Sequence, residues 1–229
     1  YEIRPRDWSS DVCSSDLGKI TRKGGFGYLP QDPRIEGIYD GRSAISHILS
    51  GRNFDDDLMR IEKLRIAMEE DASDRNVQRF SRAEEEFAMK GGYAAESEAR
   101  SIAAGLGMGG GRLDLPVGVL SGGERRRVEL SRILFAGSDA LLLDEPTNHL
   151  DVDAKSWLLE FLRQYRGALL VISHDLDLLD EAITRVLHLD RVAEDATGHL
   201  VEYRGTYSQY QRARADDEER LAKKRSEEH

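Results

Sequence analysis

Short apolar segments of strand length, separated by longer amphipathic stretches, constrain the fold of this chain more than any other feature. The apolar segments lie at residues 26–29, 140–143 and 168–172. Helical periodicity marks the stretches at residues 124–135 and 153–165. This alternation of strand and helix predicts an α/β domain with a mainly parallel sheet.

A pair of polar helices is predicted between the first two strands. Residues 55–70 and 73–89 each carry apolar side chains on one narrow stripe, and charged residues fill the remaining faces. The stripes consist of Leu58, Ile61, Leu64 and Met68 in the first segment and of Val77, Phe80 and Phe87 in the second. We expect an antiparallel helical hairpin that projects from the core, flanked by a capped helix at 40–49 and a helix at 94–106. The hairpin is either a solvated subdomain or an arm that binds a partner.

The C-terminal part predicts two more strands and a long charged helix. Residues 186–189 and 199–203 have strand character and are joined by a turn at Thr197 and Gly198. Residues 211–228 are rich in charge and almost free of apolar side chains. Such a helix cannot bury a face in this domain, so we interpret it as the beginning of a linker.

The composition limits the class of protein. With 229 residues and 39% hydrophobic content, the chain can bury one sizeable core and a smaller appendage. A formal net charge of −10 disfavours a surface that coats nucleic acid everywhere, although it is compatible with a local basic patch. The longest apolar runs are far shorter than the ~20 residues of a membrane span. The single cysteine, Cys13, excludes a disulfide framework and suits the reducing cytoplasm, where we expect the protein to be soluble.

The first 17 residues look foreign to the rest of the chain. Residues 1–17 resemble the conceptual translation of a common short-read sequencing adapter, and on that interpretation they carry no information about the fold. The alternative is a genuine leader rich in Ser and Asp. That leader would lack both the apolar region of a signal peptide and the Arg-rich composition of a transit peptide.

Three polar blocks adjoin the predicted strands and the helix between them. Asp144 and Glu145 directly follow the second strand, and His174 closely follows the third. Because the carboxyl ends of parallel strands meet at one edge, these side chains are expected where open α/β sheets bind ligands. Residues 121–123 (SGG) open a helix, where backbone N–H groups and a flexible backbone suit an anion. Each block alone is equally compatible with a plain helix cap.

Together the three blocks carry a family resemblance. Residues 120–124 (LSGGE), 141–151 (LLLDEPTNHLD) and 172–175 (ISHD) resemble, in order and spacing, the signature, Walker B with D-loop, and switch histidine of ATP-binding cassette ATPases. Residues 28–33 (YLPQDP) are similar to the Q-loop of that family. The resemblance covers about residues 18–210 and implies the P-loop NTPase cassette fold with a helical subdomain at about 43–120 and a linker at 211–229.

The resemblance implies ATP and Mg²⁺ as ligands and a role for each matching residue. Asp144 would bind Mg²⁺, Glu145 would activate the attacking water, Gln31 would reach both, and His174 would contact the γ-phosphate. The nucleotide held by an opposing cassette would be contacted by Ser121, Gly122, Gly123 and Glu124, with Asp151 linking the two sites. Without the combined motif, Gln31 is a turn residue, His174 a helix-start residue and Asp151 an N-cap.

Two features near these motifs receive no ligand role. The basic run at residues 125–127 is interpreted as solvated helix surface, because no aromatic residue is interleaved with it. His47, His188 and His199 have no metal-ligand spacing and are interpreted as surface or core histidines.

No phosphate-binding loop precedes the Q-loop. Residues 18–21 (GKIT) have Ile20 where a P-loop requires Ser or Thr, so we expect that this cradle was lost from the recorded sequence. The recorded chain is therefore expected to bind ATP poorly on its own.

The wording of residues 148–151 (NHLD) is similar to the ABC-F subfamily, whose members carry two cassettes on one chain and no membrane domain. This implies an ATPase that acts on the ribosome, with rRNA and tRNA near its linker and a second cassette of the same parent chain as its partner. The alternatives are the ATPase subunit of a membrane transporter, an SMC-type ATPase head, and a degenerate cassette with a structural role. An SMC head would require a far longer insertion between Gln31 and Ser121.

Overall fold

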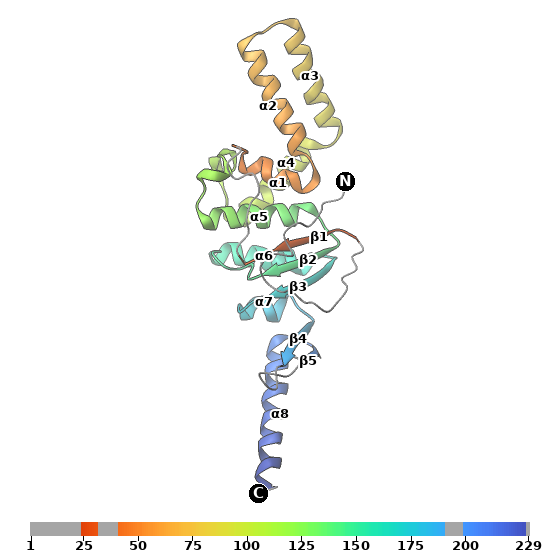
Figure 1. Ribbon diagram of the computed structural model, residues 1–229, viewed down its shortest axis with the longest axis vertical. Coiled ribbons are helices and arrows are strands. Elements are labelled where there is room, and N and C mark those ends of the chain that lie inside the picture. Colours follow the sequence, from red (N-terminus) through yellow and green to blue (C-terminus); the bar gives the residue numbers. More distant parts are fainter. Residues whose placement is uncertain (1–23, 32–40, 191–198, 228–229) are drawn as a thin grey trace, which may run out of the picture.

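The computed structural model describes residues 24–31, 41–190 and 199–227, and the chain is elongated (Figure 1). A helical hairpin projects at one end, a long helix extends at the other, and a small sheet with its helices lies between them. The adapter-like residues 1–17, Gly18 to Thr21, the last two residues of the Q-loop (Asp32 and Pro33) and the turn at Thr197 and Gly198 fall outside the described residues.

The central sheet has three parallel strands in the order β1-β2-β3. They are β1 (Phe26–Leu29), β2 (Ala140–Asp144) and β3 (Ala168–Ile172). The register places Leu29 beside Leu143, and Asp144 beside Ile172. The predicted α/β fold with a parallel sheet is confirmed, and the residues that follow each strand lie at one edge of the sheet.

One face of the sheet is well covered. Helix α5 (Gly122–Ala136) lies against β1, where a Cβ atom placed at Gly27 would be 2.6 Å from Cγ2 of Ile133. Leu141 and Leu143 of β2 are buried in the same core. Two further helices follow the strands, α6 (Val152–Gln164) after β2 and α7 (Leu176–Glu181) after β3. The alternate residues of β3 face outward, because Leu170 is 48% and Ile172 is 62% exposed.

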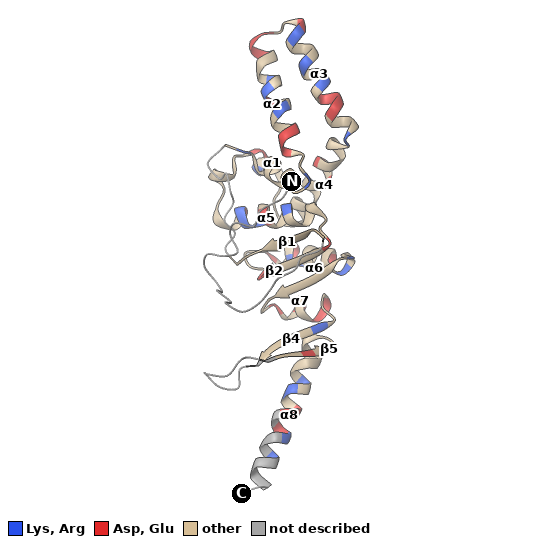
Figure 2. Ribbon diagram, turned by 45° about the vertical axis from the view of Figure 1, so that its right-hand side comes forward, with Lys and Arg blue, Asp and Glu red and all other residues tan. Residues whose placement is uncertain are grey.

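The helical subdomain consists of α1 (Ala44–Leu49), α2 (Asp55–Glu70), α3 (Asp74–Met89) and α4 (Gly92–Gly105), with short 3-10 turns at 50–52, 110–114 and 117–119. Helices α2 and α3 form the predicted projecting hairpin, and both carry charges of either sign along their length (Figure 2). Ion pairs join the two helices, Arg60 to Glu86 at 2.8 Å and Lys90 to Asp57 at 2.7 Å.

The first helix of the subdomain starts later than predicted. The expected helix at 40–49 begins at Ala44, because Ser43 is its N-cap and accepts a hydrogen bond from the N–H of Ser46. The N–H of Ala44 donates to the carbonyl of Leu115 at 3.0 Å, which ties this end to the loop before the signature block. Asp40 lies outside the described residues.

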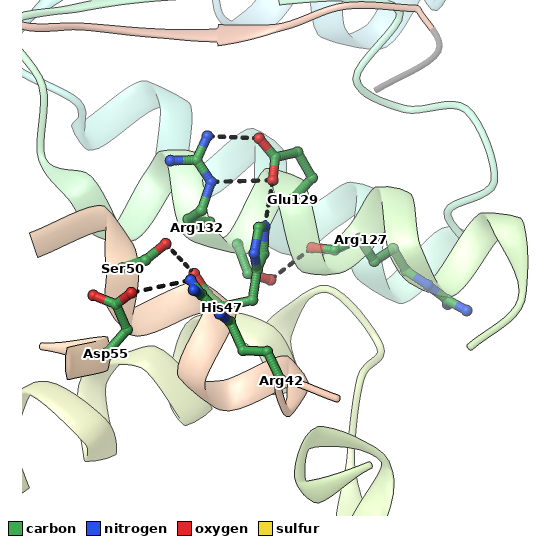
Figure 3. A network of polar contacts seen from close by, with 8 residues as sticks. Arg42, His47, Ser50, Asp55, Arg127, Glu129 and Arg132 are labelled. Carbon is green, nitrogen blue, oxygen red and sulfur yellow. Dashed lines mark hydrogen bonds and ion pairs between the residues drawn. The ribbon is translucent and has the colours of Figure 1, made fainter. Parts of the chain in front are cut away.

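A buried polar network joins α1 to α5 (Figure 3). Nε2 of His47 lies 2.7 Å from Oε2 of Glu129, and Arg132 makes two hydrogen bonds to the same carboxylate at 3.0 and 2.6 Å. Burial raises the pKa of Glu129, but the hydrogen bonds from His47 and Arg132 outweigh it and lower that pKa to about 2. His47 is therefore a core histidine that fastens the helical subdomain to the signature helix.

The C-terminal part contains the predicted strand pair and helix. Strands β4 (Arg185–Asp190) and β5 (His199–Arg204) are antiparallel, and α8 spans Tyr207–Glu227. Helix α8 begins four residues earlier than predicted, because the N–H of Ser208 donates to Asp180 of α7 at 2.7 Å and fixes the first turn. Within the described part, no helix combines the length and apolar character needed to cross a bilayer.

Candidate functional site

The two carboxylates of the predicted site follow β2 directly. Asp144 is its last residue, and Glu145 adopts a left-handed backbone conformation with φ of 49°. The N–H of Glu145 donates to the carbonyl of Ile172 at 2.8 Å, so the turn is held against the end of β3. A non-glycine residue in this region is strained and persists only where its surroundings fix it, as is common at functional sites.

The structure brings Glu145 and His174 together. Oε2 of Glu145 lies 2.8 Å from Nδ1 of His174, a contact close enough for an ion pair, although the atoms are not aligned as a hydrogen bond. The side chain of Glu145 is 16% exposed, whereas that of His174 is 77% exposed. Oε2 of Glu145 is buried and accepts no hydrogen bond from the described residues. The carboxylate of Glu145 and the accessible imidazole of His174 therefore lie side by side at the carboxyl ends of two strands, where a general base is expected.

Gln31 is connected to Asp144 and Glu145 because one arginine side chain binds the main-chain carbonyls of all three residues. Gln31 lies two residues beyond the end of β1, and its side chain is exposed. The guanidinium of Arg126 donates to the carbonyls of Pro30 and Gln31 with one nitrogen and to those of Asp144 and Glu145 with the other. The prediction that residues 125–127 form solvated helix surface is wrong for Arg126, which is only 6% exposed. Its position on the inner side of α5 turns it toward the strand ends.

The sequence contains a signal that distinguishes Arg126 from its neighbours. Arg126, Leu130 and Ile133 follow the i, i+4, i+7 spacing of one helix face, and all three are buried. Arg125 does not lie on this face, and its side chain forms no hydrogen bond or ion pair with the described residues. The helical period, and not the charge of the run, therefore identifies the buried arginine.

The signature block is built as a capped helix start. Ser121 accepts a hydrogen bond from the N–H of Glu124 at 3.3 Å, and Glu124 accepts one from the N–H of Ser121 at 2.8 Å, which is a capping box. The hydrogen bond from the Ser121 backbone, with further help from Arg112, lowers the pKa of Glu124 to about 2. Gly122 has open space where a side chain would stand, and Gly123 faces the Cβ of His149. Ser121 and Gly122 are exposed at this helix start, although both the N–H and the hydroxyl of Ser121 donate to the carboxylate of Glu124.

Asp151 is the N-cap of α6, where its carboxylate accepts a hydrogen bond from the N–H of Ala154 at 2.9 Å. It lies at the exposed start of that helix, and its side chain forms no hydrogen bond or ion pair with Glu145 or His174 in the described part of the chain. Four residues later, Lys155 pairs with Asp175 at 2.9 Å, so α6 is tied to the segment that carries His174. Helix α6, which Asp151 caps, is therefore linked by an ion pair to the residue that follows His174.

The residues present fit Mg²⁺ and a nucleotide only in part. Among the described residues, no three His, Cys, Asp or Glu side chains converge as a metal-binding group. Mg²⁺ commonly uses one or two carboxylates and completes its shell with water and phosphate oxygens, so Asp144 with the amide of Gln31 is a sufficient protein contribution. Phosphate oxygens and water would have to complete the coordination shell, so the fit of the protein residues alone is partial.

Comparisons with known proteins agree with this geometry. A family described as ABC transporter matches residues 20–148, which is more than half of the chain. The YheS protein of Escherichia coli K12, described as a probable ATP-binding protein, is 42% identical over 123 residues, covering 54% of this chain and 18% of that protein. The tylosin resistance ATP-binding protein TlrC of Streptomyces fradiae is 35% identical over 225 residues, covering 90% of this chain and 40% of TlrC.

The chain thus spans less than half of the length of either relative. Among solved structures, one titled RNase-L Inhibitor has a TM-score of 0.52 at 22% identity, over 87% of this chain and 32% of that chain, which shows a shared fold. The profile match, the parallel sheet and the residues gathered at its edge lead to one conclusion. The chain belongs to the ABC transporter family and contains an ATPase domain of the P-loop NTPase class.

Proposed function

We propose that this chain is the first ATP-binding cassette of a longer, ABC-F-type protein that hydrolyses ATP and acts on the ribosome. The observation that carries the catalytic part is the contact of Glu145 with His174 at the end of two adjoining parallel strands. A carboxylate carried on a strained turn, beside an exposed imidazole, is suited to polarising water.

Each residue has a distinct task in this mechanism. Mg²⁺, when bound with ATP, neutralises the charge that develops on the phosphates. Asp144 and Gln31 would hold that ion, Glu145 would take the proton of the attacking water, and His174 would orient the γ-phosphate. The ion pair of Lys155 with Asp175 keeps the segment carrying His174 close to α6.

The second half of the composite site would come from another cassette. Ser121, Gly122 and Gly123 form an exposed helix start with open space beside Gly122, and we propose that they grip the nucleotide of the partner cassette, with Glu124 fixing their conformation. Asp151 would meet the partner from the start of α6. A protein with two cassettes is supported by the chain spanning only 18 to 40% of its relatives YheS and TlrC.

Substitution of Glu145 tests the catalytic proposal. In the complete two-cassette protein, Glu145→Gln should leave binding of a fluorescent ATP analogue unchanged and lower phosphate release about 10² to 10⁴-fold, the usual contribution of a general base. The matched control is Glu160→Gln, an exposed carboxylate on α6 that should leave both measurements unchanged. An unchanged hydrolysis rate in Glu145→Gln would remove this residue from its role.

The same analogue tests the prediction about the chain as recorded. Without a phosphate cradle, the isolated chain should show no micromolar binding of the analogue. Saturable binding in the micromolar range would mean that the residues described here suffice to hold the nucleotide.

The ribosomal part of the proposal is supported by α8 and by the sequence of residues 148–151. Helix α8 is charged and largely exposed, as expected for a linker that leaves the cassette. TlrC, which matches 90% of this chain, is described as a resistance protein against tylosin. The Glu145→Gln protein with ATP should co-sediment with 70S ribosomes on a sucrose gradient. Failure to co-sediment, together with activation by a co-expressed permease, would favour the alternative of a transporter subunit.

A further inference from the structure

One guanidinium holds the ends of two strands. Nη1 of Arg126 donates to the carbonyl of Pro30 at 3.0 Å and to that of Gln31, and Nη2 donates to the carbonyls of Asp144 and Glu145 at 2.7 and 3.0 Å. The first two acceptors follow β1 and the other two end β2. Arg126 itself belongs to α5, so three separate elements meet at this side chain.

These contacts need an arginine. The guanidinium is a planar fork whose nitrogens donate in fixed, diverging directions, and it stays charged at every relevant pH. Nη1 donates to the two carbonyls that follow β1, and Nη2 donates to the two carbonyls at the end of β2. A lysine ammonium is a single point and cannot occupy both positions.

Three of the four acceptors belong to residues that the proposed mechanism needs. Gln31 and Asp144 would hold Mg²⁺, and Glu145 would activate water. Gln31, however, follows β1 and lies beyond the last paired residues, Leu29 and Leu143. The ladder between β1 and β2 therefore ends before Gln31 and Asp144. Beyond the end of this ladder, the hydrogen bonds of Arg126 fix the segment after β1 relative to the turn after β2.

We propose that Arg126 is a positioning residue for ATP hydrolysis, which holds the Gln31 segment and the Asp144–Glu145 turn at the spacing needed for Mg²⁺ and the attacking water. It also links these segments to the signature helix, because Arg126 lies about one turn from Gly122, the first residue of α5. A shift of α5 when its start contacts a nucleotide would be passed to the two strand ends. This inference rests on the proposed roles of Gln31, Asp144 and Glu145.

The first test uses amide hydrogen exchange in the chain itself. The N–H groups of Glu145 and Asn148 are bonded to the carbonyls of Ile172 and Glu145, so they report directly on the turn that Arg126 holds. Arg126→Met should accelerate exchange of these amides about tenfold or more relative to amides in the middle of α6. Arg125→Met, one residue away on the same helix, is the charge-matched control and should leave them unchanged.

A second control separates positioning from loss of stability. Glu129→Gln removes another buried polar contact of α5, the one that faces α1, and should destabilise the chain without selective exchange at residues 145–148. Arg126→Lys covers the case in which Arg126→Met fails to fold, and it should give the same local acceleration in milder form.

The third measurement is the Mg²⁺ dependence of hydrolysis in the complete two-cassette protein. Arg126→Met should lower kcat at least about tenfold and raise the Mg²⁺ concentration for half-maximal rate, while KM for ATP changes less, since a misplacement of about 1 Å can cost about 10²-fold in rate. The proposal is overturned if exchange at residues 145–148 matches that of Arg125→Met, or if Arg126→Lys behaves as the unsubstituted protein. If instead Glu145→Gln still hydrolyses ATP, the proposed roles fail while the exchange result for Arg126 stands.

Discussion

The buried network of His47, Glu129 and Arg132 predicts a large and pH-dependent loss of stability when Glu129 is changed to Gln. In the folded chain the pKa of Glu129 is lowered to about 2 from an ordinary value of 4.5. A difference of about 2.5 units, at about 1.4 kcal/mol per unit, corresponds to about 3 kcal/mol. Removing one partner of a buried ion pair commonly costs about 3 to 5 kcal/mol, which agrees in magnitude.

The sign of the pH dependence follows from the lowered pKa. A carboxylate whose pKa is lower in the folded state contributes its full stabilisation above the unfolded value of 4.5 and loses it as the pH falls toward about 2. The unsubstituted chain should therefore lose about 3 kcal/mol over this window, in addition to other titrating groups. The difference in unfolding free energy between it and Glu129→Gln should be largest at neutral pH and shrink toward pH 2.

Thermal unfolding followed by circular dichroism measures both effects. For a chain of this size about 3 kcal/mol corresponds to a fall in Tm of about 6 to 12 °C. The control is Glu98→Gln, which removes an equally forked pair with Arg52 at 2.7 Å whose side chains are 35% and 47% exposed. Exposed pairs contribute less than about 1 kcal/mol, so the control should fall by only a few degrees. Equal shifts in the two variants, or a Glu129→Gln difference that is constant from pH 7 to pH 2, would refute the reasoning.

Two further substitutions test the packing and the start of α6. Gly27→Val should lower the free energy of unfolding by about 1 to 3 kcal/mol, because a Cβ atom there would lie 2.6 Å from Ile133 and 3.0 Å from Leu141. Urea unfolding measures this change, and an unchanged midpoint would contradict the packing of α5 on β1. Asp151→Ala should cost about 1 kcal/mol through loss of the N-cap, whereas Asp151→Asn should restore most of it in the same assay.

The elements of this fold could be predicted from the sequence where local periodicity and caps decide the structure. The strands at 26–29 and 168–172 and the helix at 55–70 agree with the structure to the residue. The helix start was misplaced at 40–49, where a distant partner, the carbonyl of Leu115, fixes the backbone at Ala44. Local pattern cannot supply a contact that joins residues so far apart in the chain.

The position of the candidate site could be predicted from the sequence, but the hydrogen bonds that hold its segments together could not. The rule for parallel strands placed the residues after β2 and β3 at one edge, and the contact of Glu145 with His174 agrees with it. The role of Arg126 was missed, because composition treats three adjacent arginines alike while rotation of about 100° per residue turns only one toward the strand ends. The roles of Gln31, Asp144, Glu145, Asp151, His174 and the signature residues 121–124 all remain predictions.

Contacts at the start of α8 fix that end of the helix, so that a small tilt there produces a large displacement at the other end. Asp180 accepts a hydrogen bond from the N–H of Ser208 in the first turn of the helix. The hydroxyl of Tyr210 lies 2.9 Å from Nδ1 of His188 in β4, so the helix is held from two sides. Its 21 residues span about 31 Å. A tilt of about 10° at the gripped end, no larger than an ordinary packing adjustment, would sweep the far end through about 5 Å, the rise of one helical turn. A tilt of α8 that is too small to rearrange the cassette would in this way displace the C-terminal end of the helix by about the length of a side chain.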